Sequence, residues 1–149
     1  MLCTKHSFLT GFLAGTSATA ILFSAVHLGP KAEHKSFKKP DETRTFPKGK
    51  LELVKVGGAM IGRATLEPGW RWSTSVKDLA KTDSCLAPHF QYHVSGTLRV
   101  RMDDGTEFDC KPGDISLLPS GHDAWVVGNE AAVVVDFQGM LDYAKADKE

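Results

Sequence analysis

Short apolar runs separated by turn-forming residues fill the chain from residue 51 onward, and this pattern constrains the fold more than any other feature. We predict strands over residues 51–56, 59–66, 70–76, 89–95, 98–102, 107–110, 115–118, 124–127 and 132–137. Between them lie turn sequences such as EPG (67–69), DDG (103–105), KPG (111–113) and PSG (119–121). Because Pro and Gly break regular strands and favour turns, many short strands indicate an all-β sandwich, barrel or jelly roll.

Composition agrees with one globular domain and excludes some partners. The chain has 149 residues, of which 42% are hydrophobic and 24% charged, and its formal net charge is zero. These values are ordinary for a folded domain. Since no basic excess is present, we expect no nucleic-acid partner.

The first 28 residues differ from the rest and are interpreted as a membrane anchor or a signal segment. Residues 7–28 contain no Asp, Glu, Lys or Arg, and residues 8–28 are long enough to cross a bilayer as one helix. A single-pass N-terminal anchor is the first interpretation. The alternatives are a cleaved secretory signal, which would make the protein secreted, and a buried soluble helix. The side of the membrane stays open.

Residues 29–50 are polar, rich in Lys and Pro, and we interpret them as a linker to a domain spanning 51–149. Three cysteines, Cys3, Cys85 and Cys110, are an odd number and show no disulfide framework. A Cys85–Cys110 disulfide is nevertheless the rival to any role of Cys85 in metal binding.

Two segments carry a family resemblance. The stretch TDSCLAPHFQYHVSG (82–96) leads into a hairpin, and PGDISLLPSGH (112–122) joins a turn, an apolar strand and a second turn. Together they resemble the two motifs of cupins, which are small jelly-roll barrels. The sequences PGWRWS (68–73) and GHDAWVVG (121–128) are similar to one subgroup of that family. The resemblance implies a double-stranded β-helix for the domain.

The chain departs from the usual cupin metal ligands, which are three His and one Glu. His89 stands at the place of the Glu, Cys85 at that of the second His, and Ala124 replaces the His of the second motif. His122 lies two residues before Ala124, and in a regular strand the two side chains share a face. The resemblance therefore implies a divalent-metal site of Cys85, His89 and His122. Asp83 or water is the expected fourth group.

Cys and His donors suit Zn²⁺ first, with Fe²⁺ as the alternative. Alternation along 89–95 places His89, Gln91 and His93 on one face, and the opposite register would expose them. The resemblance favours the inward register. Candidate catalytic residues are His93 and Asp123, and the candidate pocket residues are Gln91, Tyr92, Trp70 and Trp72.

Two functions remain open from the sequence. The first is a membrane-tethered cupin that binds a metal and a small molecule in its barrel, whose open metal position can polarise a carbonyl or activate water. The second is a non-catalytic module for ligand binding or sensing, or for forming a homodimer. The residues alone do not decide between an enzyme and a sensor.

Overall fold

The structure is a computed structural model that describes residues 31–145. Within this range, no helix has the length and apolar character needed to cross a membrane. The anchor or signal segment predicted over residues 1–28 lies outside the described residues, so it stays a prediction of the sequence. The linker prediction is described only from residue 31 onward.

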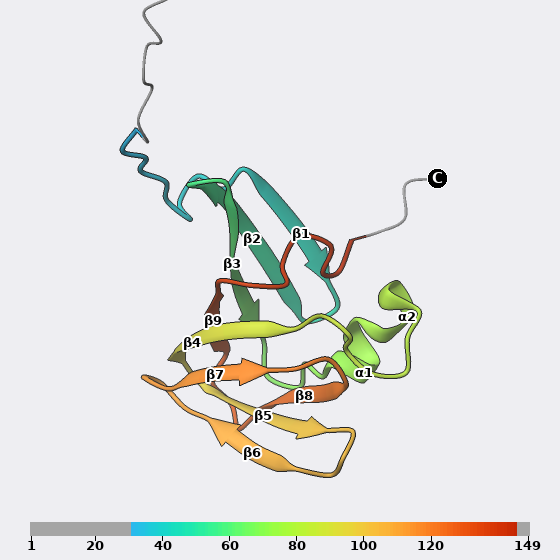
Figure 1. Cartoon of the computed structure of the whole chain (residues 1–149). Helices are drawn as coiled ribbons and strands as arrows, with labels where there is room; N and C mark the ends of the chain where they lie inside the picture. The colour runs from blue at the N-terminus through green and yellow to red at the C-terminus, as the bar shows by residue number, and fades with distance from the viewer. Residues whose placement is uncertain (1–30, 146–149) are drawn as a thin grey trace, which may run out of the picture. The chain divides into compact units, whose positions relative to one another are not determined.

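Nine strands of the described region form two antiparallel sheets (Figure 1). The strands are β1 Glu42–Phe46, β2 Gly49–Val56, β3 Ala59–Leu66, β4 His89–Ser95, β5 Thr97–Met102, β6 Glu107–Cys110, β7 Ile115–Leu118, β8 His122–Val127 and β9 Ala132–Asp136. One sheet has six strands in the order β1-β2-β3-β9-β4-β7, and the other has three in the order β6-β5-β8. The prediction of an all-β fold is confirmed.

Glycine-containing turns allow two of the hairpins to form. Gly57 and Gly58 join β2 to β3, and both have positive φ angles of 58° and 79°. A two-residue turn of this kind matches the twist of the flanking strands, and Gly adopts it without steric cost. The hairpin predicted from the Asp104-Gly105 turn is also present, since β5 pairs with β6.

The hydrophobic core lies between the two sheets. The six-stranded sheet contributes Leu51 and Leu53 of β2, and the three-stranded sheet contributes Val100 of β5; none of these is measurably exposed. Strand β4 alternates buried and exposed positions, and β8 alternates buried and half-buried ones, as the period of a strand requires. Burial therefore fixes the inward face of these two strands and the direction in which their polar side chains point.

One predicted strand was wrong. Residues 70–76 contain the short helix α1, Trp72–Ser75, which is followed by α2, Lys77–Ala80. The carboxylate of Asp123 on β8 accepts hydrogen bonds from the backbone N–H (3.1 Å) and hydroxyl (3.0 Å) of Ser73, in the first turn of α1. Such a carboxylate stabilises a helix start. Because Asp123 is distant in sequence, local alternation could not reveal it.

The range predicted as linker contains a strand. Residues 42–46 form β1, which pairs with β2 from Glu42↔Leu53 to Phe46↔Gly49. The strand's inward positions are Arg44 and Phe46. A buried arginine in a Lys-rich stretch gives no apolar alternation, so the strand was hidden from pattern reading.

Two neighbouring leucines of β7 test which side chains of this strand point into the core and which point to solvent. Leu118 is buried in the core, whereas Leu117 is 69% exposed. We expect Leu118→Ala to lower the free energy of unfolding by about 3 kcal/mol, because it leaves a cavity. Leu117→Ala should change it by less than about 0.5 kcal/mol. Urea denaturation of both variants checks this, and equal effects would contradict the assignment.

Candidate metal centre

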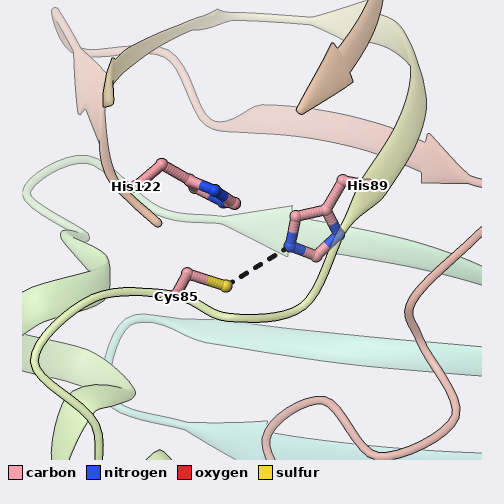
Figure 2. Close-up of side chains that lie close together, drawn as sticks. All are labelled: Cys85, His89 and His122. Carbon is pink, nitrogen blue, oxygen red and sulfur yellow. Dashed lines mark hydrogen bonds between the residues drawn. The ribbon is translucent and has the colours of Figure 1, made fainter. Parts of the chain in front are cut away.

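The structure brings Cys85, His89 and His122 together in the protein interior (Figure 2). Their potential ligand atoms all lie within 4.8 Å of one another, and all three residues are buried. The Sγ atom of Cys85 is 3.5 Å from Nε2 of His89. These are the three residues that the sequence resemblance implied as metal ligands.

Backbone pairing positions each of the three side chains. His89 is the first residue of β4 and lies on its inward face. Cys85 lies in the preceding loop and forms an antiparallel bridge with His122, the first residue of β8; the Cys85 N–H donates to the His122 carbonyl at 2.8 Å. Residues opposite each other in such a bridge project to the same side. The loop holding Cys85 is thereby tied to the strand holding His122.

Both imidazoles are oriented by their second nitrogen. Nδ1 of His89 is 2.6 Å from a carboxylate oxygen of Asp136, and Nδ1 of His122 is 2.9 Å from the carbonyl of Pro119. A carbonyl oxygen can only accept, so Nδ1 of His122 carries the hydrogen that it donates, and a carboxylate oxygen accepts in the same way from Nδ1 of His89. With Nδ1 engaged in this way, Nε2 is the ring nitrogen of each histidine that can face a metal ion.

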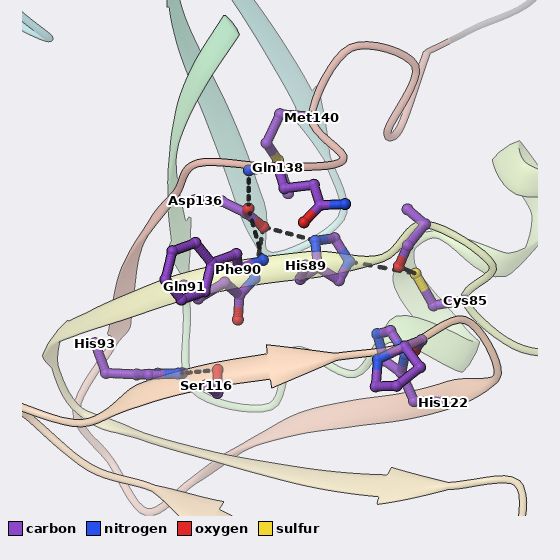
Figure 3. A network of polar contacts seen from close by, with 12 residues as sticks. Cys85, His89, Phe90, Gln91, His93, Ser116, His122, Asp136, Gln138 and Met140 are labelled. Carbon is purple, nitrogen blue, oxygen red and sulfur yellow. Dashed lines mark hydrogen bonds and ion pairs between the residues drawn. The ribbon is translucent and has the colours of Figure 1, made fainter. Parts of the chain in front are cut away.

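Asp136, the last residue of β9, is the buried centre of this network (Figure 3). Its carboxylate accepts hydrogen bonds from His89, from Nε2 of Gln91 (2.9 Å), and from the backbone N–H groups of Phe90 (3.3 Å) and Gln138 (2.8 Å). Sequence analysis missed this residue. The available signal was a single acidic residue within the apolar run 132–137, where an unpaired charge would be costly.

The donor set fits a divalent ion of borderline softness. For a tetrahedral zinc ion with usual Zn–S and Zn–N lengths, the sulfur and nitrogen atoms lie about 3.5 Å apart. The distance between Sγ of Cys85 and Nε2 of His89 agrees with this spacing. A carboxylate–histidine pair such as Asp136–His89 is also the usual support of a metal-bound imidazole. These residues could therefore hold Zn²⁺, and the same donors also suit Fe²⁺.

Burial keeps the metal-free site uncharged at the thiol and at His122. Desolvation raises the pKa of the Cys85 thiol to about 12, and the nearby Asp136 and Asp123 charges act in the same direction. Desolvation also lowers the pKa of His122 below its ordinary value. A metal ion would therefore have to displace the thiol proton, whereas His122 already favours its neutral, ligating form.

The two candidate catalytic residues lie elsewhere. His93 is buried further along β4, where its Nε2 contacts the Ser116 hydroxyl at 2.9 Å (Figure 3). Asp123 points away from the cluster and binds the guanidinium of Arg71 at 2.7 Å. We therefore correct the assignment of Asp123, which caps helix α1 and pairs with arginine. His93 has the predicted inward register, but it does not belong to the Cys/His cluster.

The other predicted site residues also lie partly inside and partly outside the interior of the domain. Gln91, Trp70 and Trp72 line a small interior cavity beside the two histidines, and their role in binding a ligand stays a prediction. Tyr92, also predicted for the pocket, is 43% exposed on the outer face of β4 and does not line this cavity. Asp83 is fully exposed and pairs with Lys77 at 3.0 Å, away from the cluster. Cys85 and Cys110 are both free thiols, and no disulfide joins them.

Tyr143 is a second residue that sequence analysis missed. It lies after β9, in the C-terminal segment 139–145, and its ring makes an edge contact with His89 at 5.4 Å between centroids. Burial raises the pKa of its hydroxyl well above the ordinary value. Nothing in the charged sequence of this tail signals an inward-pointing side chain, because the contact depends on how the chain folds back over the barrel.

Comparisons with known proteins support the fold of this chain but carry no information about its chemistry. No family model matches the sequence, and no curated protein matches it significantly. A solved Rhizobium leguminosarum protein of unknown function shares the fold, with a TM-score of 0.50 and 18% identity over 73% of this chain and 99% of its own.

Two further similar structures are KdgF from Halomonas sp. and a cupin-superfamily sugar phosphate isomerase from Silicibacter pomeroyi. The first is 16% identical, covers 66% of this chain and 91% of its own, and has a TM-score of 0.48. The second is 19% identical, covers 66% of this chain and 73% of its own, and has a TM-score of 0.46. The second is described as a member of the cupin superfamily, and identities and TM-scores this low carry no argument about this chain.

The link between Asp136 and His89 gives a testable prediction. Asp136→Asn keeps the side-chain size but removes the charge that orients His89, so affinity for Zn²⁺ should fall roughly 10- to 100-fold. Competition with a chromophoric chelator measures this. Asp123→Asn is the matched control, since that carboxylate binds Arg71 outside the cluster. Equal effects of the two substitutions would show that Asp136 does not support a metal ligand.

Proposed function

We propose that this protein is a metal-binding barrel of the cupin type that presents one open coordination position to a small molecule. Cys85, His89 and His122 would hold a divalent ion, with Zn²⁺ as the first candidate. The proposal includes the membrane tether predicted over residues 8–28. Its strongest support is that three buried side chains place their potential ligand atoms within 4.8 Å of one another, while a hydrogen bond at Nδ1 orients each imidazole.

Three protein ligands and an exchangeable fourth position are typical of reactive zinc sites, whereas structural sites are closed by four ligands. The candidate fourth ligand Asp83 is exposed and paired with Lys77, so it supports no closed site. When bound, the ion would supply Lewis acidity to an oxygen donor at that position. The chain's own residues would bind and orient the donor and keep bulk water away.

Binding of a ligand has more support than turnover. Of the predicted proton-transfer residues, Asp123 is held by Arg71 and Ser73, and His93 is hydrogen-bonded to Ser116. A general base must lie within hydrogen-bond reach of the proton it removes. Tyr143 is the titratable side chain that packs on His89, and its raised pKa keeps it protonated near neutral pH. This arrangement suits recognition of a ligand better than removal of its proton.

Metal content tests the proposal. Full-length protein, purified reduced from the membrane fraction as the anchor predicts, should contain close to one zinc or iron per chain by elemental analysis. Cys85→Ala and His122→Ala should each lose it, because two donors rarely retain such an ion. Cys110→Ala is the matched control, since that cysteine is also buried but lies outside the cluster. A folded, metal-free wild-type protein would contradict the proposal.

The pH dependence of metal binding follows from the thiol. Because the pKa of Cys85 is about 12, its proton is present from pH 6 to 8 and must leave when a metal binds. Apparent Zn²⁺ affinity should therefore rise by at least about tenfold per pH unit and weaken correspondingly as the pH falls. Chelator competition at several pH values measures the slope. A slope of zero would exclude Cys85 as a ligand.

A further inference from the structure

Two spaces adjoin the Cys85, His89 and His122 cluster. The inner cavity, about 30 Å³, is lined by His89 and His122. The outer groove, about 870 Å³, is open to solvent and has Cys85 in its wall. Trp72 and Tyr143 line both spaces. Cys85 is therefore the cluster residue that a ligand in the groove would meet.

The inner cavity carries unpaired polar groups. Among the described residues, the buried side-chain atoms without a hydrogen-bond partner are Nε1 of Trp70, Nε1 of Trp72 and Oε1 of Gln91. All three residues line the inner cavity. Buried polar groups are normally paired, and leaving them unpaired is costly. Two donors and one acceptor in one small cavity would be satisfied by a group that both accepts and donates hydrogen bonds.

The outer groove is larger and offers an apolar surface beside its polar groups. Its walls include the apolar side chains of Val76, Leu79, Leu86 and Leu141. Its charged members Asp142 and Lys145 pair with each other at 3.2 Å. Such a surface favours an apolar body over a charged one.

Arg44 of β1 fixes the wall that carries Tyr143. Its guanidinium donates hydrogen bonds to the backbone carbonyls of Met140 (3.2 Å), Leu141 (2.9 Å) and Tyr143 (2.5 Å). Arg44 is itself buried and also pairs with Glu42 at 2.8 Å. Three bonds from one rigid, planar group hold the C-terminal segment in place. The groove is therefore part of the folded domain and not a gap beside a loose tail.

The unpaired oxygen of Gln91 decides between a neutral and an anionic head group. Oε1 of Gln91 can only accept, so its partner must carry a hydrogen. A carboxamide or a hydroxyl supplies one, whereas a carboxylate has none and would bring a charge into an interior that disfavours it.

We propose that the ligand is an uncharged small molecule whose head group, such as a primary carboxamide or hydroxyl, occupies the inner cavity while its apolar body lies in the outer groove. This inference rests on the proposed metal centre, because the head group's oxygen would reach the open coordination position. Trp72 and Tyr143 would contact both parts of the ligand, since they line both spaces.

Calorimetric titrations of the full-length, metal-loaded protein with acetamide, hexanamide and hexanoate test this inference. Each buried methylene should tighten binding roughly threefold, so hexanamide should bind at least about tenfold more tightly than acetamide. It should also bind at least about tenfold more tightly than hexanoate, which has the same length. Binding that is absent, independent of chain length, or as tight for hexanoate would overturn the inference.

Matched variants locate the two ends of the ligand. Leu86→Asp, in the groove, should weaken hexanamide binding about tenfold and leave acetamide binding unchanged. Leu117 of β7 is the matched control, because it is also more than half exposed but lies outside the groove. Leu117→Asp should change the binding of neither amide. Trp72→Phe should weaken both amides about three- to tenfold by removing one donor, whereas Trp125→Phe, outside the cavity lining, should not.

Elemental analysis of the same preparations separates the two hypotheses. Protein that never takes up metal contradicts the proposed function and removes the basis of this inference. Metal-loaded protein that fails the amide series overturns the inference alone. If both Trp72→Phe and Leu86→Asp leave hexanamide binding unchanged, the ligand binds elsewhere and the inference is wrong.

Discussion

The hydrogen bond between the Asp136 carboxylate and Nδ1 of His89 is the interaction on which the site depends. It joins β9 to β4 inside the barrel and fixes which nitrogen of His89 faces Cys85. A fully buried carboxylate is tolerated because four donors satisfy it, two of them backbone N–H groups. The cost of burying that charge is thus offset by the same bonds that orient the proposed metal ligand.

Backbone pairing and side-chain hydrogen bonds together make the cluster rigid. The bridge between Cys85 and His122 sets their separation, and the Pro119 carbonyl orients the second imidazole. A set of donors held in place before the metal arrives loses little conformational entropy on binding. Of the two spaces next to the cluster, the inner cavity is lined by both histidines and by the residues with unpaired polar atoms, and the outer groove has Cys85 in its wall.

Sequence reasoning reached the cluster through the spacing of the two cupin-like motifs and the period of the strands. The alternation along β4 put His89, Gln91 and His93 on one face, and the family resemblance placed that face inward. The same alternation put His122 on the face of Ala124. Most strands next to Pro and Gly turns were also well predicted; residues 70–76, which follow the turn at 67–69, were the exception. The strand period and the turn signals both depend on residues that are close to one another in the chain, which is why the sequence alone revealed them.

What the sequence could not show depends on contacts between distant residues. Asp136 and Tyr143 reach the site only because β9 and the C-terminal segment fold against β4, and Asp123 caps α1 from 50 residues away. Strand β1 was hidden for the same reason, because the carbonyl partners of buried Arg44 lie nearly 100 residues further on. Contacts between residues so far apart in the chain leave no local pattern in the sequence.

X-ray absorption spectroscopy at the zinc edge of the full-length, reduced protein tests the central claim most directly. A site of Cys85, His89 and His122 with one open position should give a first shell of one sulfur at about 2.3 Å, two imidazole nitrogens at about 2.0 Å and one further light atom. A shell without sulfur, or one with four protein donors and no exchangeable position, would contradict it.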